Sequence, residues 1–270
     1  MSHAQDNSNG SPIARAFVDA RRTGRALTAY PGREPASMDA AYRIQDEAIA
    51  AWPDRIAGWK LGRINAPHDA RFAAGRLAGP IFSRAIWTAG ALPTRFGVIT
   101  GGFAAVEAEY VLELGDTAPD HGDWTTAKVG ALVSRVFTGI EIAGSPFAGV
   151  NDHGPAVTAS DFGNNAGLIL GAEIADWRSR LADLTCTMSI DSVVVGRGGA
   201  TSIPGGPLDS LAFLLNLLHR RGRRLETGQL ISTGAATGVH GIVAGQVAIA
   251  DFGDDGRIEC LAVPATGEAP

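Results

Sequence analysis

Glutamates occupy alternate positions in an apolar segment that has the pattern of a β-strand. Across residues 106–114, apolar side chains alternate with a second set that contains Glu107, Glu109 and Glu113, so the two sets lie on opposite strand faces. Carboxylates two residues apart on one face stand about 6–7 Å apart, and one divalent cation can take an oxygen from each. The alternative is a strand whose charged face lies in solvent.

A third glutamate, Glu141, lies at the centre of the β-branched and aromatic run 136–142, between two isoleucines. An unpaired buried carboxylate is costly, so Glu141 lies on an exposed edge or is held by a cation or an arginine. Three carboxylates from two strands, with no His or Cys nearby, form an all-oxygen ligand set. Such a set favours Mg²⁺ or Mn²⁺ over Zn²⁺.

The composition favours an enzyme or binding protein with a small-molecule ligand. The chain has 270 residues, of which 45% are hydrophobic, and a net charge of -5 without a large Lys/Arg cluster, which argues against nucleic acid as a partner. Cys186 and Cys260 lie in apolar surroundings and build neither a disulfide framework nor a paired-Cys zinc site, so a reducing cytoplasm is the expected setting.

The N-terminal part predicts a polar tail followed by two helices. Residues 1–11 are rich in Asn and Ser, and we expect a disordered tail there rather than a signal peptide. A helix is expected from Pro12 to the stop at Gly24, and another over 38–52. Together they form a helical layer over residues 12–55. No uncharged apolar run reaches the roughly 18 residues of a membrane span, so no membrane is expected as a partner.

Beyond residue 55 the pattern changes to short apolar runs separated by glycine and proline, which predicts a mixed β structure within an α+β fold over residues 56–265. Two helices interrupt it, near 126–137 and over 207–221. The expected strands are 58–62, 79–87, 106–114, 136–142, 184–195, 229–233 and 243–252.

Five short motifs occur along the chain: Gly58-Trp59-Lys60-Leu61-Gly62, Glu107-Ala108-Glu109, Gly139-Ile140-Glu141-Ile142, Ala159 to Gly167, and Ser232-Thr233-Gly234. In this order and spacing, over roughly residues 12–255, the sequence resembles the 2-keto-4-pentenoate hydratase and 4-oxalocrotonate decarboxylase family of the fumarylacetoacetase-like group. This resemblance implies a fumarylacetoacetase-like mixed β roll with peripheral helices. It also implies a homo-oligomer, in some cases complexed with a paired pathway enzyme.

The resemblance implies a role for individual residues. Glu107, Glu109 and Glu141 match the family's metal ligands, Lys60 its active-site lysine, and Ser160 a residue that binds the carboxylate end of the substrate. The further positions expected to bind substrate are Leu61, Asp161, Asn165, Thr233 and Gly234. Asp161, Asn165 and their neighbour Asn164 equally fit a turn or a cap, and Thr233 and Gly234 equally fit a strand-end turn.

Two departures affect the predicted activity. The hydratase branch usually carries an acidic residue in the segment that corresponds to 77–82, and this chain has none there. The hydrolases of the wider group use a histidine that finds no match between His3 and His68. His153 and His240 lie in glycine-rich loops, where each is either a catalytic group or a residue that forms hydrogen bonds within its loop. Four arginines are expected to be surface charges, with the alternative that one of them reaches a distal carboxylate of the substrate: Arg63, Arg71, Arg76 and Arg84.

The expected reaction is metal-dependent addition of water to a 2-hydroxy-2,4-dienoate, which gives a 4-hydroxy-2-oxo acid. Bound to the 1-carboxylate and 2-oxygen, the ion would stabilise charge on that oxygen. Lys60 would bind the carboxylate or transfer a proton, aided if partial burial lowers its pKa. Decarboxylation of a 4-oxalocrotonate-type acid is the alternative. Acylpyruvate hydrolysis ranks third, and a non-catalytic partner subunit is disfavoured because all three ligands are present.

Overall fold

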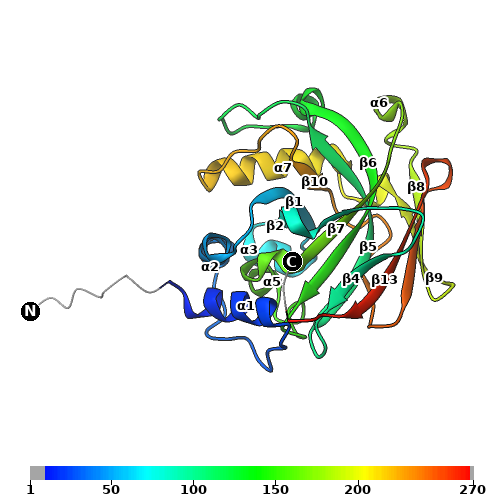
Figure 1. The fold of residues 1–270 in the computed structure, drawn as a ribbon. Helices are drawn as coiled ribbons and strands as arrows, with labels where there is room; N and C mark the ends of the chain where they lie inside the picture. The colour runs from blue at the N-terminus through cyan, green and yellow to red at the C-terminus, as the bar shows by residue number, and fades with distance from the viewer. Residues whose placement is uncertain (1–9, 268–270) are drawn as a thin grey trace, which may run out of the picture.

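Two mixed β-sheets form the body of the molecule, and helices surround them (Figure 1). The computed structural model describes residues 10–267, so the tail predicted over residues 1–11 lies outside the described residues except for its last two positions. Both helices and β-sheets occur within residues 10–267, which confirms the predicted α+β class. No helix within it combines the length and the apolar composition needed to cross a bilayer.

The two N-terminal helices form where the sequence predicts them. α1 (Pro12–Thr23) ends at Gly24, whose φ of 64° is the left-handed conformation that glycine adopts at little cost. α2 (Met38–Ala51) begins at Ser37, whose Oγ accepts the N–H of Ala40 at 3.2 Å.

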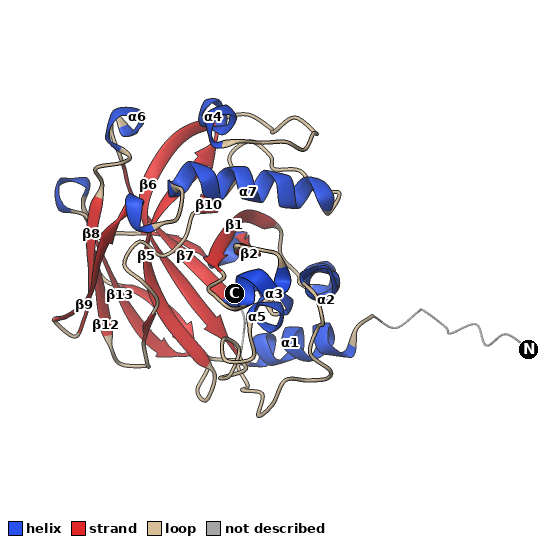
Figure 2. Cartoon of the chain, turned by 180° about the vertical axis from the view of Figure 1, so that it is seen from behind, coloured by secondary structure: helices blue, strands red, loops and turns tan. Residues whose placement is uncertain are grey.

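Along the chain, each of the remaining helices occurs between two strands. α1, α2, α3 and α5 gather on one side of the molecule, and α7 crosses above the strands β1 (Ile56–Arg63) and β10 (Leu230–Ser232) (Figures 1 and 2). Their bounds are α3 (His68–Phe72), α4 (Thr126–Val129), α5 (Pro155–Ser160), α6 (Trp177–Arg180) and α7 (Gly206–Arg220).

The larger sheet has the strand order β2-β1-β10-β5-β6-β7-β3, and β11 also pairs with β5. β1 runs parallel to β10, whereas β5 is antiparallel to both β10 and β6. The strands are β1 (Ile56–Arg63), β2 (Arg76–Phe82), β3 (Ile86–Thr88), β5 (Phe103–Leu114), β6 (Val133–Ser145), β7 (Asn165–Glu173), β10 (Leu230–Ser232) and β11 (His240–Gly241).

The smaller sheet has the order β4-β13-β12-β8-β9 and forms the side of the molecule opposite to α1 and α2 (Figure 1). Its strands are β4 (Thr94–Val98), β8 (Thr185–Ile190), β9 (Val193–Gly199), β12 (Val247–Asp251) and β13 (Arg257–Pro264).

Both faces of the central pair β5 and β6 are buried. On one face Val106, Tyr110 and Leu112 belong to the main apolar core. On the other face Val111 packs with Phe137 in a second apolar cluster. The alternative of a strand with one solvated face is therefore wrong for the central part of β5, and a carboxylate there must find a partner inside the protein.

Three predicted elements need correction. The helix expected near 126–137 ends at Val129 and, after a single 3₁₀ turn, β6 begins at Val133, because its β-branched and aromatic residues pair with β5. The run 184–195 is a hairpin of two strands, with positive φ at Asp191 and Ser192. The run 79–87 also divides, since β2 ends at Phe82 and β3 pairs elsewhere, with β7.

Candidate metal centre and active site

The antiparallel pairing of β5 with β6 brings the three predicted ligands together. Glu107 lies directly opposite Glu141, and Glu109 lies opposite Gly139. The three side chains are buried, with exposed fractions of 4%, 0% and 0% for Glu107, Glu109 and Glu141. One carboxylate oxygen from each lies within 4.8 Å of the others. This arrangement is a preformed cluster of oxygen ligands.

The cluster is electrostatically costly without a cation. Burial, with a further contribution from Glu141, raises the pKa of Glu107 to about 8, although Lys60 opposes the shift. Burial also raises the pKa of Glu109 well above its usual value, and the charges of Glu141 and Glu107 add to this. The site therefore binds protons more tightly than ordinary carboxylates do, and a divalent cation can take their place.

Two oxygens of the cluster fit a metal ion directly. Among the described residues, Glu109 Oε1 and Glu141 Oε2 are buried and have no hydrogen-bond donor. Buried carboxylate oxygens are ordinarily paired, because desolvation without a partner is costly. Oxygen ligands of this kind suit Mg²⁺ or Mn²⁺.

The other oxygen of Glu109 is fixed by the segment that follows β10. Ser232 Oγ donates to Glu109 Oε2 at 2.5 Å, and the backbone N–H of Gly234 donates to the same oxygen at 2.9 Å. Thr233 lies between them, and its hydroxyl donates to the carbonyl of Tyr110 at 2.7 Å. The Ser-Thr-Gly motif thus holds a candidate ligand in place.

Lys60 lies in β1, between Ser232 of β10 and Gly79 of β2. Its Nζ lies 3.2 Å from Glu141 Oε1 and donates to Asn164 Oδ1 at 3.0 Å. Burial acts to lower the pKa of Lys60, but the charges of the three glutamates outweigh burial and raise it. The condition that burial lowers the pKa of Lys60 is therefore not met in the protein without a bound ion, because the lysine neighbours a cluster of acids.

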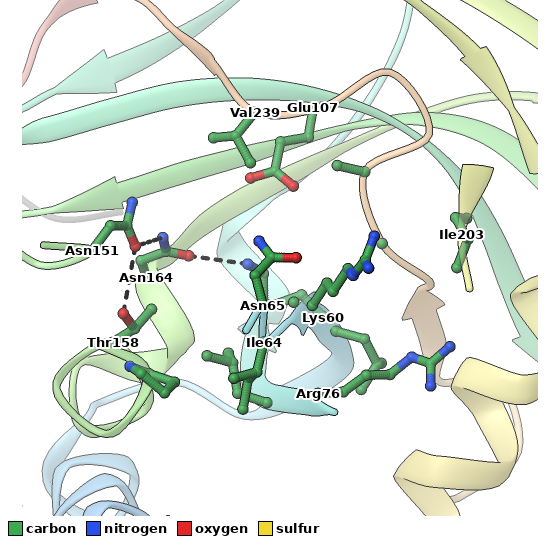
Figure 3. A pocket seen from close by; sticks show the side chains of 18 of the residues that line it. Lys60, Ile64, Asn65, Arg76, Glu107, Asn151, Thr158, Asn164, Ile203 and Val239 are labelled. Atoms are coloured by element: carbon green, nitrogen blue, oxygen red, sulfur yellow. Dashed lines mark hydrogen bonds between the residues drawn. The ribbon is translucent and has the colours of Figure 1, made fainter. Parts of the chain in front are cut away.

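A short hydrogen-bonded chain orients the lysine. Asn164 Nδ2 donates to Asn151 Oδ1 at 3.1 Å, and Thr158 Oγ1 donates to the same oxygen at 3.4 Å. Figure 3 shows Asn151, Asn164 and Thr158 at the left of the view, with Glu107 entering from above. The sequence left Asn164 open between a site residue and a turn or capping residue, and nothing singled out Asn151 or Thr158.

A cavity of about 750 Å³ opens beside these groups. Of the predicted site residues, it is lined by Lys60, Leu61, Glu107, Thr233 and Gly234. Glu109 and Glu141 belong to the buried cluster that Glu107 connects to the cavity.

Three predicted residues take other positions and do not line this cavity within the described chain. Ser160 Oγ donates to the carbonyl of Val157 at 2.7 Å and lies 2.9 Å from the hydroxyl of Tyr30. Asp161 forms a buried ion pair with Arg21. Asn165 Nδ2 donates to Glu141 Oε1 at 3.0 Å, so its amide contacts the glutamate cluster instead.

The cavity is also lined by four basic side chains, of which Arg197 was not singled out from the sequence. Arg63 and Arg76, expected to be surface charges, line it together with Arg197 and His68. His153 and His240 are not part of the lining. His153 Nδ1 lies 2.6 Å from Glu34 Oε1, and His240 Nε2 lies 3.1 Å from the carbonyl of Thr237.

Sequence comparisons with known proteins find no match, whereas structure comparisons do. No protein-family model matches this chain, and no curated protein matches it. Solved structures do match. 4-Oxalocrotonate decarboxylase from Pseudomonas putida G7 superposes with a TM-score of 0.78 over 93% of this chain and 96% of that chain, at 20% identity. The fold is that of the fumarylacetoacetase-like enzymes.

Two further similar structures are other enzymes of this kind. Fumarylpyruvate hydrolase from Pseudomonas aeruginosa has a TM-score of 0.56 and 15% identity over 79% of this chain and 91% of that chain. 2-Hydroxyhepta-2,4-diene-1,7-dioate isomerase from Mycobacterium marinum has a TM-score of 0.56 and 17% identity over 78% and 77%. The decarboxylase structures contain magnesium with adipate or calcium with acetate, and the hydrolase structure contains Mn²⁺ and pyruvate.

Proposed function

We propose that this chain is a metal-dependent hydratase that adds water to a 2-hydroxy-2,4-dienoate of the 2-keto-4-pentenoate type and yields a 4-hydroxy-2-oxo acid. The observation that carries the proposal is the buried cluster of Glu107, Glu109 and Glu141, with two oxygens that lack donors, beside a cavity that also presents Lys60. Structurally similar enzymes that hold magnesium or manganese support the choice of Mg²⁺ or Mn²⁺.

The three glutamates would hold the ion, and a bound ion supplies Lewis-acid stabilisation of negative charge on the substrate 2-oxygen. In the dienol, the 2-hydroxyl loses its proton and C5 gains one, which leaves a double bond between C3 and C4. The oxygen of water then bonds to C4, and a proton adds to C3. Lys60 Nζ provides a buried cation that binds a substrate carboxylate and can donate a proton, and Asn164 fixes its position.

A second candidate, decarboxylation of a 4-oxalocrotonate-type acid, is favoured by the arginines of the cavity. Arg63 and Arg197 line it, and a carboxylate at the far end of the substrate would find a cation there. Arg76 is already paired with Asp209 at 3.0 Å. The similar decarboxylase structure contains adipate, a dicarboxylate.

The remaining alternatives rank lower. Acylpyruvate hydrolysis needs a histidine that activates water, and His68 is the candidate that lines the cavity. A non-catalytic partner subunit would have no need to keep three buried carboxylates together, because their burial is costly. We also propose that the chain acts as a homo-oligomer, with or without a paired pathway enzyme.

The test follows the ultraviolet absorbance of 2-hydroxypenta-2,4-dienoate with Mg²⁺, in parallel with release of CO₂ from 4-oxalocrotonate. Metal-dependent loss of the dienol absorbance that Glu109→Gln abolishes supports the hydratase. Release of CO₂ from the dicarboxylate alone assigns the chain to the decarboxylases. Activity on neither substrate, with Mn²⁺ still bound, overturns both assignments and leaves acylpyruvates or a partner-subunit role.

A further inference from the structure

Arg21 belongs to the last turn of α1, yet it is tied to the segments that carry the candidate metal site. Its Nε donates to Asp161 Oδ1 at 2.7 Å, Nη1 donates to the carbonyl of Asn165 at 2.9 Å, and Nη2 donates to the carbonyl of Gly144 at 2.8 Å. The side chain is only 9% exposed, and that of Asp161 is fully buried. A planar guanidinium can satisfy three acceptors at fixed angles, which the point charge of a lysine cannot.

These bonds join two strands at a place where their own pairing is irregular. Gly144 lies in β6, three residues after Glu141, and Asn165 is the first residue of β7. The register between β6 and β7 shifts between Ile142 and Ala143, so Asn165 pairs with Ala143 across an irregularity in the ladder. Arg21 supplies backbone contacts on both strands at this point.

The contact continues from Asn165 to the metal cluster. The side-chain amide of Asn165 donates to Glu141 Oε1 at 3.0 Å and to the carbonyl of Gly167 at 3.3 Å. Glu141 Oε1 is also 3.2 Å from Lys60 Nζ. With Oε1 held in this way, Oε2 is the oxygen without a donor and is free to bind an ion.

We propose that Arg21, paired with Asp161, is a positioning residue for the metal ligand Glu141 and acts through Asn165. The N-terminal helix α1 is then a functional part of the metal centre. The inference rests on the proposed metal site. Outer contacts of metal ligands fix their orientation, and their loss typically weakens metal binding about 10- to 100-fold.

The experiment measures Mn²⁺ binding by calorimetry and by the electron paramagnetic resonance of free Mn²⁺, without substrate. The variants are Arg21→Lys, Asn165→Ala, the double variant, and Asp161→Asn, which preserves side-chain volume. The control is Arg22→Lys, the adjacent exposed arginine of α1. Melting in EDTA shows that each variant is folded.

We expect Arg21→Lys, Asp161→Asn and Asn165→Ala each to weaken binding about 10- to 100-fold, and Arg22→Lys to have no effect. The double variant should bind about as weakly as Asn165→Ala alone, because residues that act in series are not additive. Unchanged affinity in folded Arg21→Lys or Asp161→Asn, or a double loss equal to the product of the single losses, overturns the inference. Absence of Mn²⁺ binding by the unsubstituted protein overturns the metal site itself.

Discussion

The three glutamates differ in the donors that surround them. Glu109 is held through one oxygen by Ser232 and Gly234, whereas Glu141 is held through one oxygen by Asn165 and Lys60. Each keeps its second oxygen without a donor. The protein therefore orients these two carboxylates and leaves one oxygen of each to a ligand, which is the arrangement a preorganised metal site requires.

Glu109→Gln should abolish tight metal binding while the fold persists. The change removes one negative charge and one ligand oxygen from a buried cluster, so we expect Mn²⁺ affinity to fall by on the order of 100-fold or more. Calorimetric titration with Mn²⁺ measures the change. The matched control is Glu113→Gln on the same strand, because Glu113 pairs with Arg135 at 2.7 Å and lies outside the cluster. Equal losses in the two variants would contradict the assignment.

The pH dependence of stability should depend on whether a metal is bound. The pKa of Glu107 rises from 4.5 to about 8 in the folded metal-free protein. Its contribution to the free energy of unfolding is therefore fully present below about pH 4.5 and is lost as pH rises through about 8. In EDTA, we expect the Tm of Glu107→Gln to fall less steeply between about pH 5 and pH 8 than the Tm of the unsubstituted protein. Parallel curves for the two proteins would contradict the buried, protonated state.

At the scale of elements, β1 and β2 position Lys60 because the backbone of β2 at Gly79 comes very close to the turn that carries Asn164. A Cβ added to Gly79 would lie 1.9 Å from the carbonyl oxygen of Phe162. Position 79 therefore has no room for any side chain.

Gly79→Ala should therefore displace the turn and destabilise the protein. Overpacking typically costs about 1–3 kcal/mol, and a backbone clash places this change at the upper end. Urea unfolding measures the loss. Gly75→Ala is the matched control, because nothing lies within 4 Å of its added Cβ, and it should be nearly neutral. A neutral Gly79→Ala would show that the turn can move freely.

The sequence predicted the strands that carry the candidate site residues better than it predicted the other strands. β1, β5 and β6 follow from alternation and β-branched residues, and these three strands position Lys60 and the glutamates. β7 was missed because its start, Asn165-Ala166-Gly167, has turn chemistry. The prediction of a helix near 126–137 was wrong because the pairing of β6 with β5 overrode a weak helical pattern.

At the scale of the whole molecule, the cavity draws its lining from both sheets. Lys60 and Glu107 come from the larger sheet, whereas Arg197 comes from β9 of the smaller one. The convergence of the glutamates could be predicted because they lie on neighbouring strands. The contribution of Arg197, like that of Arg21, could not, because it depends on how distant elements pack.

Arg197→Gln should impair a dicarboxylate substrate selectively. A hydrogen bond to a charged group contributes about 1.5–3 kcal/mol, so KM for 4-oxalocrotonate should rise about tenfold or more. KM for 2-hydroxypenta-2,4-dienoate should stay unchanged, and steady-state kinetics with both substrates measures the difference. Arg257→Gln, in the same sheet but outside this cavity, is the control. Equal effects on both substrates would contradict a distal carboxylate subsite at Arg197.

The position of β10 between β1 and β5 also sets an order of assembly. β1 cannot join the larger sheet directly, because residues 58–60 pair with residues 230–232, which in turn pair with β5. During synthesis, the β5–β6 hairpin with its glutamates is complete long before residue 230 leaves the ribosome. Lys60 and the donors to Glu109 reach the glutamates only after residues 230–234 have been made, so the nascent protein carries an acidic hairpin without its neutralising partner. Divalent ions present during synthesis should therefore act on the growing chain as well as on the finished protein.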